Sequence, residues 1–151
     1  AGFTSAYAAG GAVASQNGEE LYPDDLENAF SREEMVVLTE DFTIANTIRV
    51  ENTQDGASLD LNGHTLTFSP EVDGGDTLLS AIQIVGESKM RIFDSKGGGG
   101  ITAANKNTVA VQCGEPECGD SELVIDGGNF TAANIILPVL NAKVTINGVN
   151  F

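Results

Sequence analysis

Apolar and polar residues alternate along many short stretches of this chain, and bends rich in Asn, Asp and Gly follow these stretches. In residues 57–67, for example, the polar Asp60 separates Leu59 from Leu61. Alternation of this kind places one face of a strand in a core and the other face in water. Asn62 and Gly63 then bend the chain, because both residues tolerate a positive φ. The pattern predicts a strand, a bend and a second short strand.

The same arrangement recurs along the chain. Further copies lie at residues 89–97, 122–130 and 143–151, and equivalent apolar positions are 21 to 33 residues apart. Periods of this length are typical of stacked structural repeats, which bury a continuous core only together. The repeats predict an all-β parallel β-helix, a solenoid. The alternative is an antiparallel β-sandwich, which also has many short strands. We consider it less favoured, because we expect no Asn-Gly pair to join adjacent strands as a two-residue hairpin. Asn62-Gly63 and Asn147-Gly148 lie inside the repeated motif.

Three segments are expected. Residues 1–18 are rich in Gly and Ala, and we expect them to pack on their own domain or to become ordered against another chain. Residues 19–34 form a helical cap, since Pro23 suits a first helical turn and apolar residues recur at helical spacing in Tyr22–Phe30. Residues 35–151 form the β-helix, whose open end such a cap would cover.

The charge of the chain makes some classes of binding partner unfavourable. The chain has 22 acidic and seven basic residues, a net charge of −15. Such a surface repels phosphate backbones and anionic lipids, so we expect no nucleic acid partner. No apolar run approaches the roughly 18 residues of a membrane helix, so we expect no membrane insertion. The small first residue, Ala1, is compatible with a mature chain after signal-peptide removal, or with a trimmed one.

Several stretches resemble a known family. Residues 36–44 and 59–67 resemble the opening coils of pectate-lyase-like, right-handed parallel β-helix proteins, in particular modules of large secreted and cell-surface bacterial proteins. Residues 92–102 and 124–131 are similar to later coils. The resemblance covers roughly residues 35 to 151. It implies a right-handed β-helix and an extracellular setting, whereas such modules serve as adhesins, spacers and carbohydrate-active enzymes alike.

Four polar residues occupy comparable bend positions: Asn62, Asp94, Asp126 and Asn147. We expect them to stack as a ladder along the solenoid. The resemblance implies one role, because enzymes of this fold use clustered carboxylates as calcium ligands or acid/base pairs. The other role is structural, since Asn and Asp bond to the local backbone. The structural role is favoured, as two of the four are Asn and basic residues are scarce. We expect no catalytic residue, no metal and no cofactor.

Two other polar features are weaker candidates. Residues 73–76, with Glu71 just before them, have oxygen ligands for calcium but lack the spacing of a recognised loop, so a solvated turn is expected. His64, the single histidine, points outward by alternation and is expected to be a surface residue.

Cys113 and Cys118 are separated by Gly, Pro and two Glu residues. A disulfide closes such a loop if the two Cα atoms come within about 7 Å. Zinc needs four ligands, and the Cys-x-x-Cys spacing of redox motifs is not met. We therefore expect a disulfide, which favours an oxidising, extracellular location.

The sequence favours an extracellular structural or adhesive protein that forms a subunit of a surface filament or layer. We expect head-to-tail self-association, with Phe3 and Tyr7 of one copy setting the register against the last coil of another, around Val149 and Phe151. Neighbouring coils of a longer chain are the other possible partner. The alternative function is a polysaccharide-binding or polysaccharide-cleaving domain, a lyase or hydrolase, with glycans as partners.

Overall fold

The computed structural model describes residues 11–71, 78–103, 105, 107–115, 120–132, 134–138 and 142–151. These residues form mostly β-strands, arranged in three sheets. Sheet A has the order β15 (Lys143–Asn147), β12 (Glu122–Asp126), β9 (Lys89–Phe93), β6 (Ala57–Asp60), β3 (Met35–Leu38), β1 (Ala14–Gln16) and β2 (Glu19–Leu21). Sheet B has the order β13 (Asn129–Thr131), β10 (Gly100–Ala103), β7 (Thr65–Phe68) and β4 (Phe42–Ile44). Sheet C has the order β14 (Asn134–Pro138), β11 (Thr108–Cys113), β8 (Leu79–Ile84) and β5 (Ile48–Val50).

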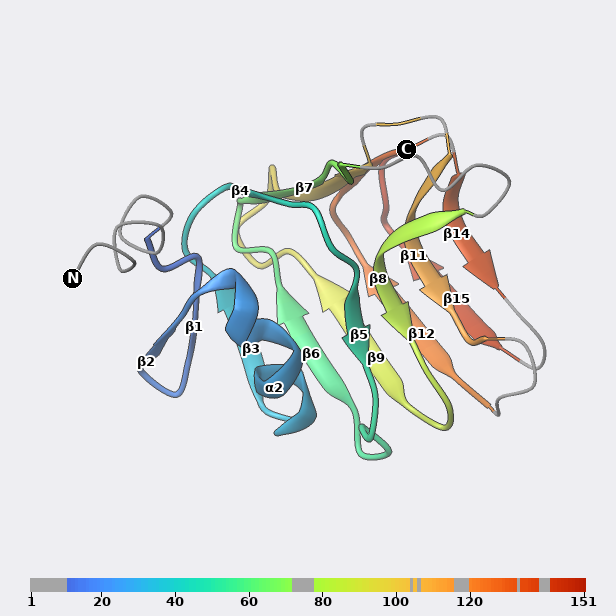
Figure 1. The fold of residues 1–151 in the computed structure, drawn as a ribbon, viewed down its shortest axis with the longest axis horizontal. Coiled ribbons are helices and arrows are strands. Elements are labelled where there is room, and N and C mark those ends of the chain that lie inside the picture. Colours follow the sequence, from blue (N-terminus) through green and yellow to red (C-terminus); the bar gives the residue numbers. More distant parts are fainter. Residues whose placement is uncertain are drawn as a thin grey trace.

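From β3 onward the chain visits sheets A, B and C in turn and then begins again. Each such passage is called a circuit here; the first is β3, β4 and β5, and the second is β6, β7 and β8. Equivalent strands of successive circuits therefore lie side by side, as sheet A shows in Figure 1. Strands of successive circuits, from β3 to β15, pair with one another in parallel. The predicted all-β class is confirmed, and among the described strands antiparallel pairing is confined to β1, which pairs with β2 and β3.

The core lies between the three sheets and follows the predicted alternation. Leu59, Ile92 and Ile125 occupy one register position in neighbouring strands of sheet A, and each is at most 2% exposed. Leu66 and Phe68 of sheet B and Ile82 of sheet C face the same core. Because each inward row repeats from circuit to circuit, stacking removes apolar side chains from water along the length of the molecule.

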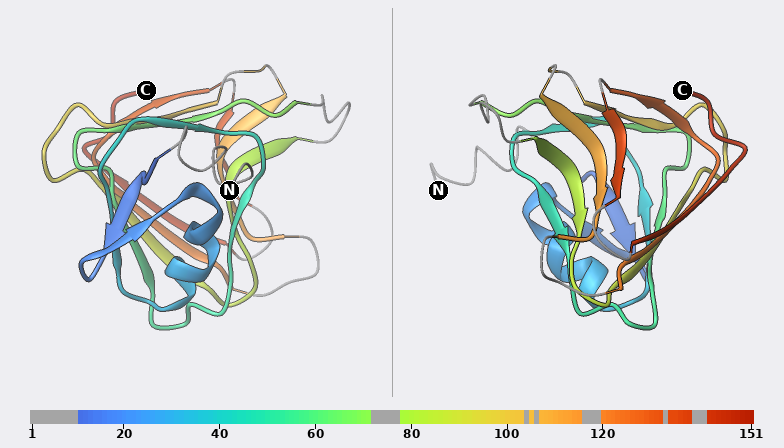
Figure 2. Two further views of the ribbon diagram at one scale, coloured as in Figure 1. Left: turned by 60° about the vertical axis from the view of Figure 1, so that its left-hand side comes forward. Right: turned by 90° about the vertical axis from the view of Figure 1, so that its right-hand side faces the viewer.

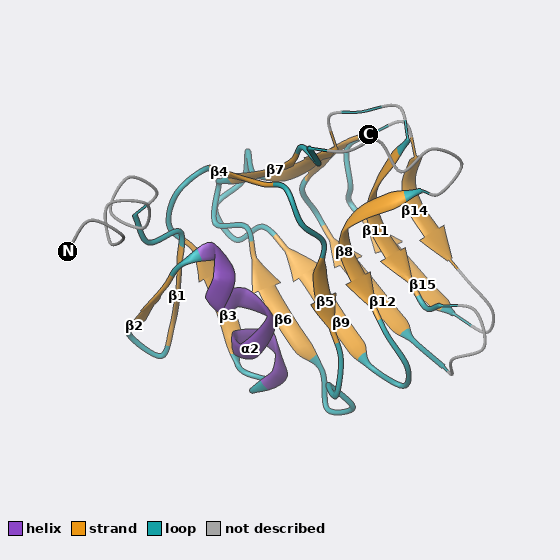
Figure 3. Ribbon diagram, viewed as in Figure 1, coloured by secondary structure: helices purple, strands orange, loops and turns teal. Residues whose placement is uncertain are grey.

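A helical cap covers the N-terminal end of the core. A 3-10 helix, η1 (Pro23–Asp25), leads into α2 (Leu26–Ser31), which ends one residue beyond the helix predicted over Tyr22–Phe30. Leu26 and Phe30 of α2 are each 1% exposed. Figure 2, left, shows α2 lying across this end of the sheets, and Figure 3 shows that the helices of the described residues gather there.

Strands β1 and β2 form an antiparallel hairpin that extends sheet A beside β3. Its turn is Asn17-Gly18, with φ of 49° and 82° as a two-residue type I′ turn requires. The amide of Gln16 is buried and donates to Ala29 O at 2.7 Å and Glu34 O at 2.9 Å, which joins the hairpin to the cap. The predicted boundary at residue 18 was wrong, because this hairpin crosses it. The expectation that no Asn-Gly pair joins adjacent strands was wrong for the same reason.

The two ends of the glycine run 97–100 need glycine for different structural reasons. Gly97 and Gly98 have φ of 84° and 86°, which L-residues rarely adopt. At Gly100, in contrast, a Cβ atom would lie 1.9 Å from Asn129 O on the next strand of sheet B. The run therefore supplies a bend followed by a close contact between neighbouring circuits.

Candidate functional site

Asp60 stands at the end of β6 and is only 5% exposed. Its Oδ1 accepts hydrogen bonds from the N–H groups of Asn62 and Ser95, each at 2.9 Å. Its Oδ2 accepts one from Ser95 Oγ at 2.7 Å. Ser95 belongs to the next circuit, so this buried carboxylate joins two neighbouring bends.

Asp94 has a similar role one circuit later. Its Oδ1 accepts hydrogen bonds from the N–H groups of Gly63 at 2.8 Å and Gly97 at 3.1 Å, and its Oδ2 accepts one from Gly99 N–H at 2.8 Å. A carboxylate that satisfies three backbone donors is held by the fold and fixes the glycine run. This arrangement supports the structural role of the bend residues.

The predicted four-residue ladder forms only in part. Asp126 and Asn147 are in register, and Asn147 Nδ2 donates to Asp126 Oδ1 at 2.7 Å. On its other side Asp126 is in register with Phe93, not with Asp94. Phe93 in turn is in register with Asp60, not with Asn62. Asp94 comes one residue too late in its circuit, and its carboxylate bonds to the glycine run instead.

An ion pair that the sequence did not predict lies on the outer face of sheet A. Arg91 Nε donates to Asp126 Oδ2 at 2.8 Å, and the Arg91 guanidinium carbon lies 4.3 Å from the centre of the Phe93 ring. The Arg91 hydrogen bond, with a smaller contribution from Asn147, holds the pKa of Asp126 below its usual value. Both charged groups are thus engaged with each other across β9 and β12.

His64 lies partly exposed beside the first circuit, where Nδ1 is 3.1 Å from Asp41 Oδ1. The same oxygen accepts the N–H of Thr65 at 2.9 Å. This backbone hydrogen bond, and then the His64 contact, keep the pKa of Asp41 below its usual value. The contact between His64 and Asp41 joins neighbouring circuits. The partial exposure of His64 agrees with the prediction of a surface residue.

Cys113 lies at the end of β11 with its side chain fully buried. Burial, and to a smaller extent the charge of Glu122, raises the pKa of the thiol to about 11. Within the described part of the chain Cys113 carries no disulfide, and Cys118 lies outside the described residues. The predicted Cys113–Cys118 bond stays a prediction. The candidate calcium loop at residues 73–76 also lies outside the described part.

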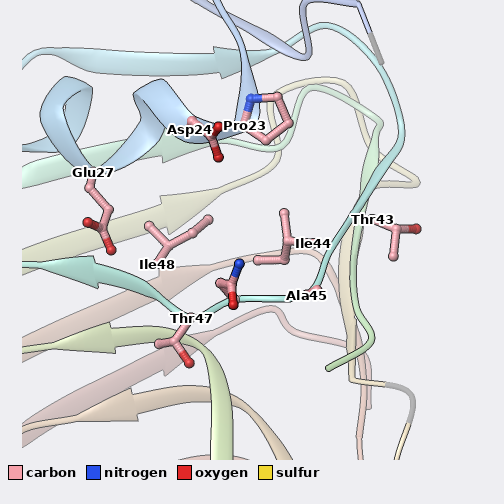
Figure 4. A pocket seen from close by; sticks show the side chains of 9 residues that line it. Pro23, Asp24, Glu27, Thr43, Ile44, Ala45, Thr47 and Ile48 are labelled. Atoms are coloured by element: carbon pink, nitrogen blue, oxygen red, sulfur yellow. The ribbon is translucent and has the colours of Figure 1, made fainter. Parts of the chain in front are cut away.

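A hollow of about 330 Å³ lies between the cap and the turn from β4 to β5 (Figure 4). Asp24 and Glu27 line it from the cap, and Thr43, Asn46 and Ile48 line it from the turn. Glu27 Oε1 already accepts the N–H of Arg49 at 2.8 Å. Among the described residues, no three His, Cys, Asp or Glu side chains come together as metal ligands. The hollow therefore gives no support for a metal site.

At the C-terminal end, apolar side chains are exposed although they are in register with buried core residues. Val144 and Ile146 of β15 are in register with Leu123 and Ile125 of β12. Leu123 and Ile125 are fully buried, whereas Val144 is half-buried and Ile146 is 42% exposed. No described strand follows β15 in sheet A, so nothing in the described part covers this row.

Residues after β15 extend this surface. The N–H of Phe130 donates to Asn150 O at 2.8 Å, so the last residues run beside β13. Phe151 is 74% exposed and Val149 is half-buried. We call Val144, Ile146, Val149 and Phe151 the C-terminal end surface. Figure 2, right, looks onto this end of the molecule. Val149 and Phe151 were predicted as association residues, whereas Phe3 and Tyr7 lie outside the described residues.

The C-terminal end also differs in charge from the rest of the chain. All 22 acidic residues lie at or before Asp126. After Asp126 the only charged side chain is that of Lys143. A surface of this composition avoids the repulsion that would keep two copies of a strongly acidic chain apart.

Comparison of the chain with profiles of protein families, with curated proteins and with solved structures found no match. In the part of the chain that the structure describes, no helix has the length and apolar character needed to cross a membrane.

Proposed function

We propose that the chain is a right-handed parallel β-helix that acts as an extracellular structural or adhesive element and self-associates through its C-terminal end surface. The cyclic order of sheets A, B and C, repeated in every circuit, supports the β-helix. The hand follows from the rule that crossover connections between parallel strands are right-handed in about 98% of cases.

The observation that carries the association is the contrast between the two ends of the core. At the N-terminal end, Leu26 and Phe30 of α2 close the core and are each 1% exposed. At the C-terminal end, Ile146 and Phe151 are 42% and 74% exposed. Large apolar side chains at the end of a stack of parallel strands, beside an unpaired edge, are typical of a surface that binds another element.

A structural role agrees with how the polar bend residues are used. Asp60 and Asp94 are bound to backbone N–H groups, and Arg91 is paired with Asp126. These groups hold neighbouring circuits together. The extracellular setting rests on the sequence alone, through the expected disulfide of Cys113 and Cys118 and the resemblance to secreted β-helix modules.

Sedimentation velocity over a range from about 5 to 500 μM tests the association, since weak protein contacts have micromolar dissociation constants. We expect the weight-average mass to rise with concentration for the unsubstituted chain. Ile146→Asp puts a charge into the proposed contact. The weight-average mass of this variant should begin to rise only at a concentration at least about tenfold higher.

Met35→Asp is the matched control, because Met35 is also a large exposed apolar residue, at 48%, but lies in β3. It should associate like the unsubstituted chain. A chain that is monomeric throughout, or two variants that weaken association equally, would contradict the proposed function. Far-UV circular dichroism confirms that each variant is folded.

A further inference from the structure

We propose that Asn129 is an acceptor site for an N-linked glycan. Residues 129–131 read Asn-Phe-Thr, which is the one complete Asn-x-Ser/Thr sequence within residues 1–151. In secreted chains this motif marks an Asn that accepts an oligosaccharide, provided that the site is exposed. The inference rests on the extracellular setting of the proposed function and adds a covalent modification to it.

Strand β13 presents both residues of the motif on the outer face of sheet B. Asn129 directly follows the bend at Gly127 and Gly128, whose φ values are 101° and 102°. Asn129 and Thr131 are exposed, whereas Phe130 between them is 1% exposed and packs in the core. Neighbouring circuits stack beside β13 along the length of the molecule, so a further circuit at either end would leave this outer face uncovered.

The hydrogen bonds of Asn129 leave its side-chain nitrogen available. The backbone N–H donates to Gly99 O at 2.9 Å, and the side-chain Oδ1 accepts a hydrogen bond from Asn150 Nδ2 at 3.0 Å. Within the described part of the chain, Asn129 Nδ2 has no acceptor. A sugar on Nδ2 replaces one of its hydrogens and leaves Oδ1 unchanged. The bond from Asn150 is therefore retained after the modification.

The modification forms one bond and breaks one. The side-chain nitrogen of Asn129 attacks C1 of an oligosaccharide that is carried on a polyprenyl diphosphate. The C1–N bond forms, the C1–O bond to the diphosphate breaks, and the diphosphate leaves with the bonding pair of electrons. The amide nitrogen gives up a proton to a base of the transferring enzyme. This chain supplies the acceptor nitrogen and the Thr131 hydroxyl group of the motif.

The surface around Asn129 has room for the first sugar. Gly100 of β10 is in register with Asn129 and has no side chain, and Thr65 of β7 is in register with Gly100. In the next outward row, Thr131 is in register with Thr102. These positions are uncharged, and their hydroxyl groups both donate and accept hydrogen bonds. A sugar lying over this face therefore buries no charge, which would be costly.

Secretion of the chain from a eukaryotic cell line, behind an added signal peptide, tests the site. Intact mass is measured before and after treatment with a peptide N-glycosidase, which converts the glycan-bearing Asn to Asp. Peptide mapping then locates the converted residue. We expect most molecules to carry one glycan, at Asn129. Asn46 and Asn147, which are exposed but lack the motif, should be unmodified.

Three variants separate the motif from the surface around it. Thr131→Ala removes the hydroxyl group and should abolish the modification, whereas Thr131→Ser keeps the hydroxyl group and should retain it. Thr102→Ala is the matched control, because Thr102 is in register with Thr131 on the same face. It should carry the glycan like the unsubstituted chain.

Both the secreted and the cell-retained protein are analysed, so a variant that folds poorly still gives a result. An Asn129 that stays unmodified in both fractions overturns the inference, as does a glycan that persists in Thr131→Ala. Sedimentation of the unsubstituted chain tests the proposed self-association separately. A chain that associates but carries no glycan therefore refutes this site alone.

Discussion

Ile125 and Ile146 occupy the same register position in neighbouring strands of sheet A, yet Ile125 is fully buried and Ile146 is 42% exposed. The two residues have the same side chain and the same inward orientation. They differ because a further strand, β15, covers the row at Ile125, whereas no described strand covers it at Ile146. The exposed row belongs to the C-terminal end surface through which we propose that the chain self-associates.

Asp60 is expected to contribute strongly to stability. Asp60→Ala leaves the N–H groups of Asn62 and Ser95 without their acceptor at a buried bend, and should lower the free energy of unfolding by about 2–3 kcal/mol. Urea unfolding followed by circular dichroism measures the loss. Glu87→Ala, at an exposed position, is the control and should change stability by less than about 0.5 kcal/mol. Equal effects in the two variants would contradict the role of Asp60.

The glycine run should respond differently at its two ends. A methyl group at Gly100 would meet Asn129 O, so Gly100→Ala should destabilise the protein by about 3 kcal/mol or prevent folding. At Gly98 there is open space, and Gly98→Ala carries only the cost of its positive φ, about 1–2 kcal/mol. Thermal unfolding of both variants gives the order. A Gly100→Ala protein at least as stable as Gly98→Ala would show that sheet B does not pack this closely.

The ion pair of Arg91 and Asp126 predicts a pH dependence. The pKa of Asp126 is lower in the folded chain than its ordinary value of 3.8. Its contribution to stability is therefore present above about pH 4 and is lost as the pH falls through the folded pKa. Asp126→Asn should therefore make the free energy of unfolding depend less steeply on pH below about pH 4. The change should be small, because the two charged groups are exposed to solvent.

Arg91→Gln removes the main cause of this pKa shift and should weaken the same pH dependence. The double variant should add little to either single change, because both act on one interaction. Unfolding free energies from about pH 2 to 6 give the comparison. An unchanged pH dependence in both single variants would contradict the predicted coupling.

Cys113 and Cys118 are predicted to form a disulfide. Alkylation of denatured, non-reduced protein should then add no mass, whereas reduction before alkylation should add two groups. Two alkylated thiols without reduction would refute the bond. In the reduced protein the pKa of Cys113, raised to about 11 from 9.0, predicts a loss of stability as the pH rises from 9.0 toward 11, because the unfolded thiol ionises first.

Local patterns predicted the elements of the fold better than the contacts between circuits. The bend at Asn62-Gly63 is encoded by two residues that accept a positive φ, with observed values of 49° and 79°. The helix before residue 35 is encoded by its own apolar spacing. Both are short-range properties, which the sequence displays directly.

The ladder and the ion pair depend on register between circuits of different length. Asp94 lies one residue beyond the position that is in register with Asp126, so it bonds to the glycine run instead of stacking on Asp126. No local sequence pattern predicts this difference of one residue. Arg91 and Asp126 are 35 residues apart and meet only through strand pairing. The hairpin at Asn17-Gly18 did have a local signature, which was obscured by the Gly- and Ala-rich composition of the segment around it.

Amide hydrogen exchange along β15, resolved by residue with NMR, tests the central claim most directly. In dilute protein the amides of Val144 and Ile146 should exchange quickly, because they point to the open edge, whereas Thr145 is protected by its bond toward β12. At concentrations where the chain associates, Val144 and Ile146 should become protected by at least about tenfold, and Thr145 should change little. Exchange at Val144 and Ile146 that stays fast at every concentration, while Thr145 remains protected, would contradict an association through this edge.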